Sequence, residues 1–168
     1  MQKPRLTLTP AQYALRLIIR AIQSTRSGDR RALQRLLDLG IPADLRDAEG
    51  NTLLALACDH GHRHIVVELL QRGASPSLCN ARGRPPLATA AFRGDTALAA
   101  LLLAAGADVD QADCEGRTPL IFAAMFDQAE TAAFLLSRGA AHGASDDHGR
   151  TATQAAVEQG AWRALRVL

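Results

Sequence analysis

Apolar and glycine positions along the chain recur with a period of 33 residues. Leucine pairs begin at positions 36, 69, 102 and 135, and a glycine follows each pair at positions 40, 73, 106 and 139. A leucine pair with a glycine shortly after it is typical of a helix that buries one face and ends in a left-handed cap. A fixed period of this length indicates stacked supersecondary units.

A second register predicts another, shorter helix in each period. An acid or amide stands at positions 47, 80, 113 and 146, with a glycine three residues later. The segment Thr118-Pro119 then shows how the helix begins, with a capping hydroxyl followed by proline at the first helical position. A turn glycine ends this helix at positions 28, 61, 94 and 160, whereas Asp127 replaces it in one period. Aspartate tolerates positive φ less well than glycine does.

The sequence of this shorter helix resembles the ankyrin repeat family. The segment Thr118-Pro119-Leu120-Ile121-Phe122-Ala123 is similar to the family's Thr-Pro-Leu-His-x-Ala, and the resemblance covers roughly residues 14–168. It implies an all-α solenoid of helix–turn–helix repeats with projecting turns, about five in number. The family histidine is absent, and the residues in its place are Ala55, Ala88, Ile121 and Gln154. We therefore expect stability to depend on apolar stacking more than on hydrogen bonds from these positions.

The period divides the sequence into six segments. We expect an N-terminal tail over residues 1–8 and a capping repeat over 9–46, because Thr9-Pro10 begins a longer helix with an apolar stripe. Ankyrin repeats follow over 47–79, 80–112 and 113–145, and a truncated repeat over 146–168. Two interpretations of Trp162 stay open: it covers the end of the stack as a lid, or this end contacts a partner molecule and allows self-association.

Composition narrows the class of protein. The chain has 168 residues, of which 48% are apolar and 4% aromatic, and its net charge is only +2. No run of about 18 apolar residues predicts a membrane span, and the first ten residues lack the apolar core of a signal peptide. The three cysteines have no metal-type spacing, so we expect reduced thiols in a cytoplasmic protein. Arginine replaces lysine almost everywhere, which is typical of GC-rich bacterial genomes.

The candidate partner-binding site follows from the resemblance, which implies that the first helices and the turns bind. At these variable positions, large apolar side chains gather on two adjacent repeats and charged residues flank them: Arg82, Arg84, Phe92, Arg93, Glu115, Arg117, Met125 and Phe126. Aromatic and arginine side chains are enriched at interface hot spots. Arginine beside an apolar centre suits a partner that carries a carboxylate near an apolar anchor. The alternative is that Phe92 and Phe126 fold back onto neighbouring helices.

A basic first repeat supports a second hypothesis. Residues 1–46 hold nine basic and three acidic side chains, whereas residues 47–168 hold ten and fourteen. The candidate patch consists of Arg16, Arg20, Arg30, Arg31 and Arg35, with Arg26 beside it. It would dock an acidic protein surface as an adaptor or inhibitor. Nucleic acid is disfavoured because aromatic residues do not alternate with these arginines and no DNA-binding motif is present.

Patterns of catalytic or metal-binding residues are weak in this sequence. His60, His62 and His64 alternate, but a turn glycine between them should splay the rings, so we expect no metal site. No nucleophile, base and acid come together, and no glycine-rich loop follows a strand. We therefore expect a non-enzymatic protein without a cofactor that binds a protein partner through repeats two to four.

Overall fold

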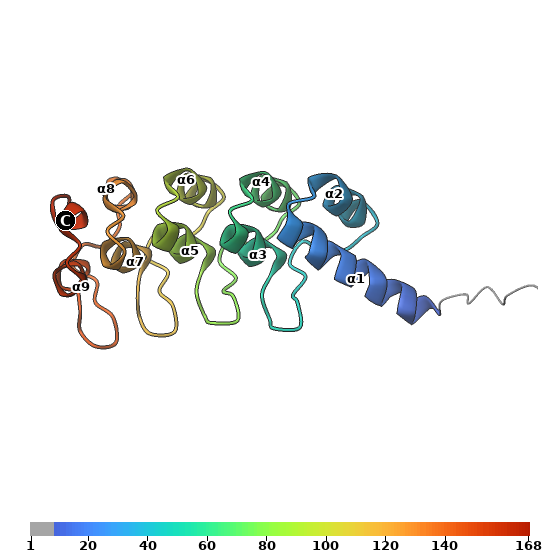
Figure 1. Ribbon diagram of the computed structural model, residues 1–168, viewed down its shortest axis with the longest axis horizontal. Coiled ribbons are helices and arrows are strands. Elements are labelled where there is room, and N and C mark those ends of the chain that lie inside the picture. The colour runs from blue at the N-terminus through green and yellow to red at the C-terminus, as the bar shows by residue number, and fades with distance from the viewer. Residues whose placement is uncertain (1–8) are drawn as a thin grey trace, which may run out of the picture.

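The computed structural model describes residues 9–168, and its helices pair along one axis into an elongated stack (Figure 1). The residues that the structure describes include no β-strand, only isolated bridges between Arg46 and Thr52 and between Ser145 and Thr151. The expected tail, residues 1–8, lies outside the described residues. The helices of residues 9–168 are α1 (Pro10–Ser27), α2 (Arg30–Asp38), α3 (Leu53–His60), α4 (Arg63–Gln71), α5 (Pro86–Arg93), α6 (Thr96–Ala104), α7 (Pro119–Met125), α8 (Ala129–Ser137), α9 (Ala152–Gln159) and α10 (Trp162–Leu165).

The helices form two layers (Figure 1). The odd-numbered helices make one layer, the even-numbered helices make the other, and long loops project beyond the odd-numbered layer. We call each helix pair with the loop before it a unit, numbered one to five from the N-terminus. The arrangement is the all-α solenoid that the resemblance implied, and it places the loops and the first helices on one side.

Local chemistry explains where the first helices begin and end. The hydroxyls of Thr52 and Thr118 accept hydrogen bonds from the backbone N–H groups of Ala55 and Ile121, so each threonine caps its helix. Pro85 takes the same place before α5 and makes no side-chain cap. Glycines at the helix ends have positive φ, as the sequence predicted, and Asp127 adopts a φ of 54° in unit four.

Small side chains let successive first helices pack closely. Cys58, Ala91 and Ala124 occupy equivalent places in units two to four, and all three are completely buried. The larger buried side chains are mainly leucines, with Phe122 on α7. Where the family has histidine, buried Ala55, Ala88 and Ile121 pack in the interior instead.

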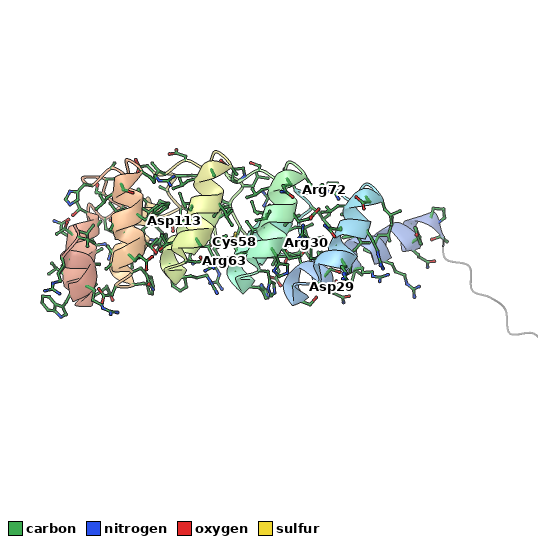
Figure 2. All side chains as sticks on the ribbon, turned by 90° about the horizontal axis from the view of Figure 1, so that it is seen from above. Asp29, Arg30, Cys58, Arg63, Arg72 and Asp113 are labelled. Atoms are coloured by element: carbon green, nitrogen blue, oxygen red, sulfur yellow. The ribbon has the colours of Figure 1, made fainter. Side chains whose placement is uncertain are left out.

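Polar links between units come from other side chains. Arg30 pairs with Glu68 at 3.1 Å, Arg63 pairs with Asp95 at 2.8 Å, and Arg72 pairs with Asp38 at 2.7 Å. The three arginines lie between neighbouring second helices (Figure 2). Most of these pairs are partly exposed, and exposed pairs contribute little stability each. They fix the register of adjacent units rather than drive the stacking.

The two ends of the stack differ from its middle. Helix α1 extends past α2 at the N-terminal end of the stack (Figure 1), and its Tyr13, Leu15 and Ile19 are exposed. At the other end Trp162 is 72% exposed, so the interpretation of Trp162 as a lid over the stack is wrong. The reason is its register: Trp162 is equivalent to Arg63, whose side chain points toward the neighbouring unit and pairs with Asp95.

Candidate partner-binding site

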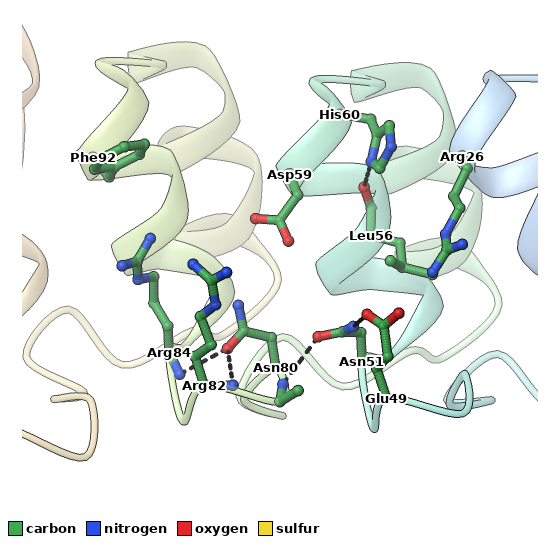
Figure 3. A pocket seen from close by; sticks show the side chains of 11 residues that line it. Arg26, Glu49, Asn51, Leu56, Asp59, His60, Asn80, Arg82, Arg84 and Phe92 are labelled. Atoms are coloured by element: carbon green, nitrogen blue, oxygen red, sulfur yellow. Dashed lines mark hydrogen bonds between the residues drawn. The ribbon is translucent and has the colours of Figure 1, made fainter.

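A hollow on the loop side lies between units two and three. It has a volume of about 670 Å³ and opens where α3 and α5 meet the loops before them (Figure 3). Its lining is mixed in charge, with Arg82 and Arg84 on one side and Asp59 facing them from the end of α3. Phe92 lies at the border of the hollow on α5. The remaining lining residues are Arg26, Glu49, Asn51, Leu56, His60, Asn80 and Ala81.

An aromatic pair lies beside this hollow. The rings of Phe92 and Phe126 meet edge to face, with their centroids 4.4 Å apart. Phe92 and Met125 are half-buried and pack against the core, whereas Phe126 is 45% exposed. Phe92 and Met125 therefore contribute partly to the core. Phe126 still presents an apolar surface to solvent, and its ring is packed against the ring of Phe92.

The arginines of the candidate site have different partners. Arg117 is held by two carboxylates, that of Asp113 at 2.7 Å and that of Glu115 at 2.8 Å. Arg93 donates a hydrogen bond of 2.8 Å to the backbone oxygen of Asp59, so it connects unit three to unit two. Arg82 is exposed and forms no ion pair within the described residues. Arg117 and Arg93 thus serve contacts within the protein, whereas Arg82 is available to a partner.

Arg84 differs from the other arginines of the candidate site because it is partly buried and forms no ion pair within residues 9–168. Its guanidinium lies over the ring of Phe92 at 5.2 Å and over that of Phe122 at 4.7 Å. Its Nε is buried and, within residues 9–168, has no hydrogen-bond partner. No carboxylate of these residues pairs with it. Burial lowers the pKa of Arg84, and the charge of Arg117 lowers it further, because both disfavour the cation.

A substitution in the loop explains this isolation. In units four and five the loop pairs an aspartate with the arginine four residues later, Asp113 with Arg117 and Asp146 with Arg150. Unit three has Asn80 where the aspartate should be. The Asn80 side-chain oxygen still accepts the backbone N–H groups of Arg82 and Arg84, so the loop keeps its shape. What is lost is only the carboxylate oxygen that would hold the guanidinium.

The pKa values of two acidic groups near the hollow, Asp59 and Asp113, are shifted in opposite directions. Burial raises the pKa of Asp59, and the charges of Arg84 and His60 only partly offset this effect. Burial would also raise the pKa of Asp113, but hydrogen bonds from Arg117 and Glu115 outweigh burial, and the pKa is lowered. Asp59 is exposed at the hollow and forms no ion pair within the described residues, whereas Arg117 holds the carboxylate of Asp113.

The basic patch of the first unit is spread over two helices. Arg16 and Arg20 are exposed on α1, and Arg31 and Arg35 are exposed on α2. Arg30 donates both of its hydrogen bonds to Glu68, so it serves the contact with unit two. Arg26 is likewise paired with Asp47 at 2.9 Å. These two pairs reduce the positive charge that the patch offers to a partner.

Two of the three alternating histidines link neighbouring units. His62 and His64 form hydrogen bonds through Nε2 to the backbone oxygens of Arg26 and Gly28, at 3.0 and 2.9 Å. His60 is hydrogen-bonded through Nδ1 to the backbone oxygen of Leu56. Among residues 9–168, no group of three or more His, Cys, Asp or Glu side chains is arranged to hold a metal ion.

Sequence reasoning missed Asp59 and Asn80 as members of the site. Asp59 occupies one of the variable positions, but its acidic charge does not match the apolar residues of the next units. Asn80 was visible as the one amide in a register of aspartates, which is the signal that could have found it. Its meaning depends on the pairs of Arg117 and Arg150, which only the structure shows.

Comparison with known proteins identifies the family. The model for ankyrin repeats (3 copies) matches residues 18–113 and 90–168, so the chain belongs to the ankyrin repeat family. This fold is a non-enzymatic one that generally serves protein–protein interaction. A search of curated proteins gives no match. No helix within residues 9–168 is long and apolar enough to cross a membrane.

Proposed function

We propose that this protein binds a protein partner along the loop side of units two to four. The observation that carries the proposal is the exposed face of Phe126, which stands on Phe92 beside the unpaired cation of Arg84. An apolar anchor next to an incompletely satisfied arginine is typical of interface hot spots. The binding residues are Arg82, Arg84, Phe92, Phe126 and Met125, while Arg93, Glu115 and Arg117 support them through the contacts described above.

The mechanism is presentation of a rigid surface. The first helices are fixed by completely buried residues on both sides, so the side chains at their ends are held before a partner arrives. A surface that is already ordered loses little conformational entropy on binding. We further propose that the protein acts in the cytoplasm, with Cys58, Cys79 and Cys114 as free thiols.

A double substitution tests the proposal. Tagged wild-type protein and the Phe92→Ala/Phe126→Ala variant are used to capture partners from an extract of the source cells, followed by mass spectrometry. We expect the specific partner to be lost with the double variant, because truncation removes the apolar anchor. Phe134→Ala is the matched control, because Phe134 is also half-buried beneath an arginine, Arg138, but lies on α8 in the other layer. Equal capture by all three proteins would exclude this surface.

A second candidate function rests on the overhang of α1. Its exposed Tyr13, Leu15 and Ile19 lie on the same helix as Arg16 and Arg20, and α1 carries no acidic residue. An acidic amphipathic partner would match this combination of apolar and basic groups. Loss of capture with Arg16→Gln/Arg20→Gln, but not with the phenylalanine variant, would favour the adaptor or inhibitor alternative.

A further inference from the structure

We propose that Arg84 is a receptor for a carboxylate of the partner, supplied by an Asp or Glu side chain or by the partner's C-terminus. This inference rests on the proposed function, because it names the chemistry that the same surface recognises. It concerns the hollow of about 670 Å³ between units two and three. Four observations support it: the missing internal acid, the placement of the guanidinium, the second arginine and the position of Asp59.

The loop of unit three lacks the acid that pairs with arginine in the loops of units four and five. Asp113 and Asp146 each use one oxygen for backbone N–H groups and the other for an arginine side chain. Asn80 reproduces the first set of bonds, at 2.9 and 3.0 Å, but offers no second oxygen to Arg84. The loop is therefore built like its neighbours, but the amide nitrogen of Asn80 replaces the second carboxylate oxygen, so Arg84 lacks an internal anion and can pair with an anion of a partner.

The guanidinium is prepared for such a contact. It lies over two aromatic rings, and Phe122 beneath it is fully buried, so its plane is supported by rigid groups. Stacking in this manner is characteristic of arginine and leaves its N–H edge available. The buried Nε has already lost its contact with water without gaining a partner. The Nη groups are not buried in the same way, so a carboxylate from a partner can reach them and form charge-assisted hydrogen bonds with a guanidinium that has no internal anion.

Arg82 and Asp59 select the kind of anion. Arg82 lies on the same loop as Arg84 and borders the same hollow, so it adds a second positive charge (Figure 3). Asp59 and Glu49 border the hollow as well and limit its total positive charge. A carboxylate with one negative charge matches this balance, whereas a phosphate near neutral pH, with close to two charges, meets more repulsion. Phe92 at the rim favours an apolar side chain next to the carboxylate.

Small carboxylates test the inference on the full-length protein by NMR of the arginine Nε–Hε groups. N-acetyl-leucine represents a polypeptide C-terminus, N-acetyl-glutamate N-methylamide represents an acidic side chain, and N-acetyl-leucine amide is the uncharged control. We expect at least one of the two acids to shift the Arg84 signal in a saturable manner and the amide to leave it unchanged. The acid that binds more tightly identifies the source of the partner's carboxylate. Inorganic phosphate should bind more weakly than that acid.

Asn80→Asp is the decisive variant, because it restores the internal acid without removing a contact of the loop. We expect the introduced carboxylate to occupy Arg84 and to weaken binding of the acid about tenfold or more. Arg84→Gln should abolish binding, while Arg138→Gln, which alters an arginine over a ring on α8, should have no effect.

Several results would overturn the inference: no Arg84 shift with either acid, equal shifts with acid and amide, tighter binding of phosphate, or unchanged binding in Asn80→Asp. Equal shifts with acid and amide would leave the proposed protein-binding surface intact. Failure of that surface is read separately, from the capture experiment with the Phe92→Ala/Phe126→Ala variant.

Discussion

The carboxylate of Asp127 accepts a hydrogen bond of 2.8 Å from the backbone N–H of Ala164, which lies in the next unit. Ala161 precedes α10 and has no polar group in its side chain to cap this short helix. Asp127 supplies the cap from a distance, and it does so from a left-handed backbone with a φ of 54°. The departure from glycine at this turn therefore stabilises the last helix.

Substitutions of Asp127 should separate the cap from the backbone strain. We expect Asp127→Asn to stay close to the wild type, since asparagine tolerates positive φ and keeps an acceptor oxygen. Asp127→Ala should lose about 1–2 kcal/mol of unfolding free energy, because it removes the cap and keeps the strain. Asp127→Gly should fall between them. Urea denaturation measures the series, and a glycine variant more stable than the asparagine variant would contradict the capping role.

Restoring the internal acid should stabilise unit three. In Asn80→Asp the new carboxylate would hold Arg84 as Asp113 holds Arg117. We expect a gain of about 0.5–1 kcal/mol, because the pair is partly exposed. Asn80→Ala should be destabilising, because it removes the two backbone hydrogen bonds that Asn80 accepts. An Asn80→Asp variant less stable than the wild type would show that Arg84 does not lack a partner.

Asp59 should oppose binding of a carboxylate in the hollow. Its negative charge lies near Arg84 and Arg82, whose charges lower its pKa but do not overcome burial. We expect Asp59→Asn to strengthen binding of the acidic probe by about 2- to 10-fold, since one repulsive charge is removed. The NMR titration of the Arg84 signal measures this change. Weaker binding in the variant would mean that Asp59 itself takes part in recognition.

Stability should fall in acid because of the loop carboxylates. Burial would raise the pKa values of Asp113 and Asp146, but hydrogen bonds to the arginine and to backbone N–H groups lower them overall. Such a group stabilises the fold fully above its ordinary pKa and loses this contribution as the pH falls through the lowered folded value. We expect the urea midpoint to drop between about pH 5 and pH 2, and the drop to be smaller in Asp113→Asn/Asp146→Asn. An equal drop in both proteins would assign the effect to other groups.

The exposed Trp162 predicts contact between molecules at the C-terminal end. Val157 is 58% exposed, although Cys58, Ala91 and Ala124 at equivalent places are completely buried by the next unit. An apolar end of this kind favours association. We expect any concentration-dependent dimer in sedimentation velocity to weaken in Trp162→Ala. A wild-type protein that stays monomeric at high concentration would contradict this prediction.

Regular features of the sequence were sufficient to predict the fold. The leucine pairs and the glycines with positive φ act locally, so their spacing translates directly into helices and turns. The contents of the candidate site depend on contacts between units and could be predicted only in part. Phe92, Phe126 and Arg84 were identified by their positions, but the ion pairs that occupy Arg117 and the absence of one at Arg84 follow from three-dimensional neighbours.

Trp162 and the basic patch are two further features that the sequence could not predict. The sequence could not decide between a lid and an exposed end, because the direction of the indole depends on the register of α10 against α8 and α9. Arg30 and Arg26 appeared available in the sequence, but acids 38 and 21 residues away hold them. Long-range partners of this kind leave no local signal.

The most direct test of the central claim is hydrogen–deuterium exchange of the protein with and without its captured partner. Binding at the proposed surface predicts protection at the loop and helix segments that hold the aromatic pair and Arg84, residues 80–94 and 118–127, with little change in α2 and α8. Protection confined to α1 and α2, or protection only at the C-terminal end, would contradict the account.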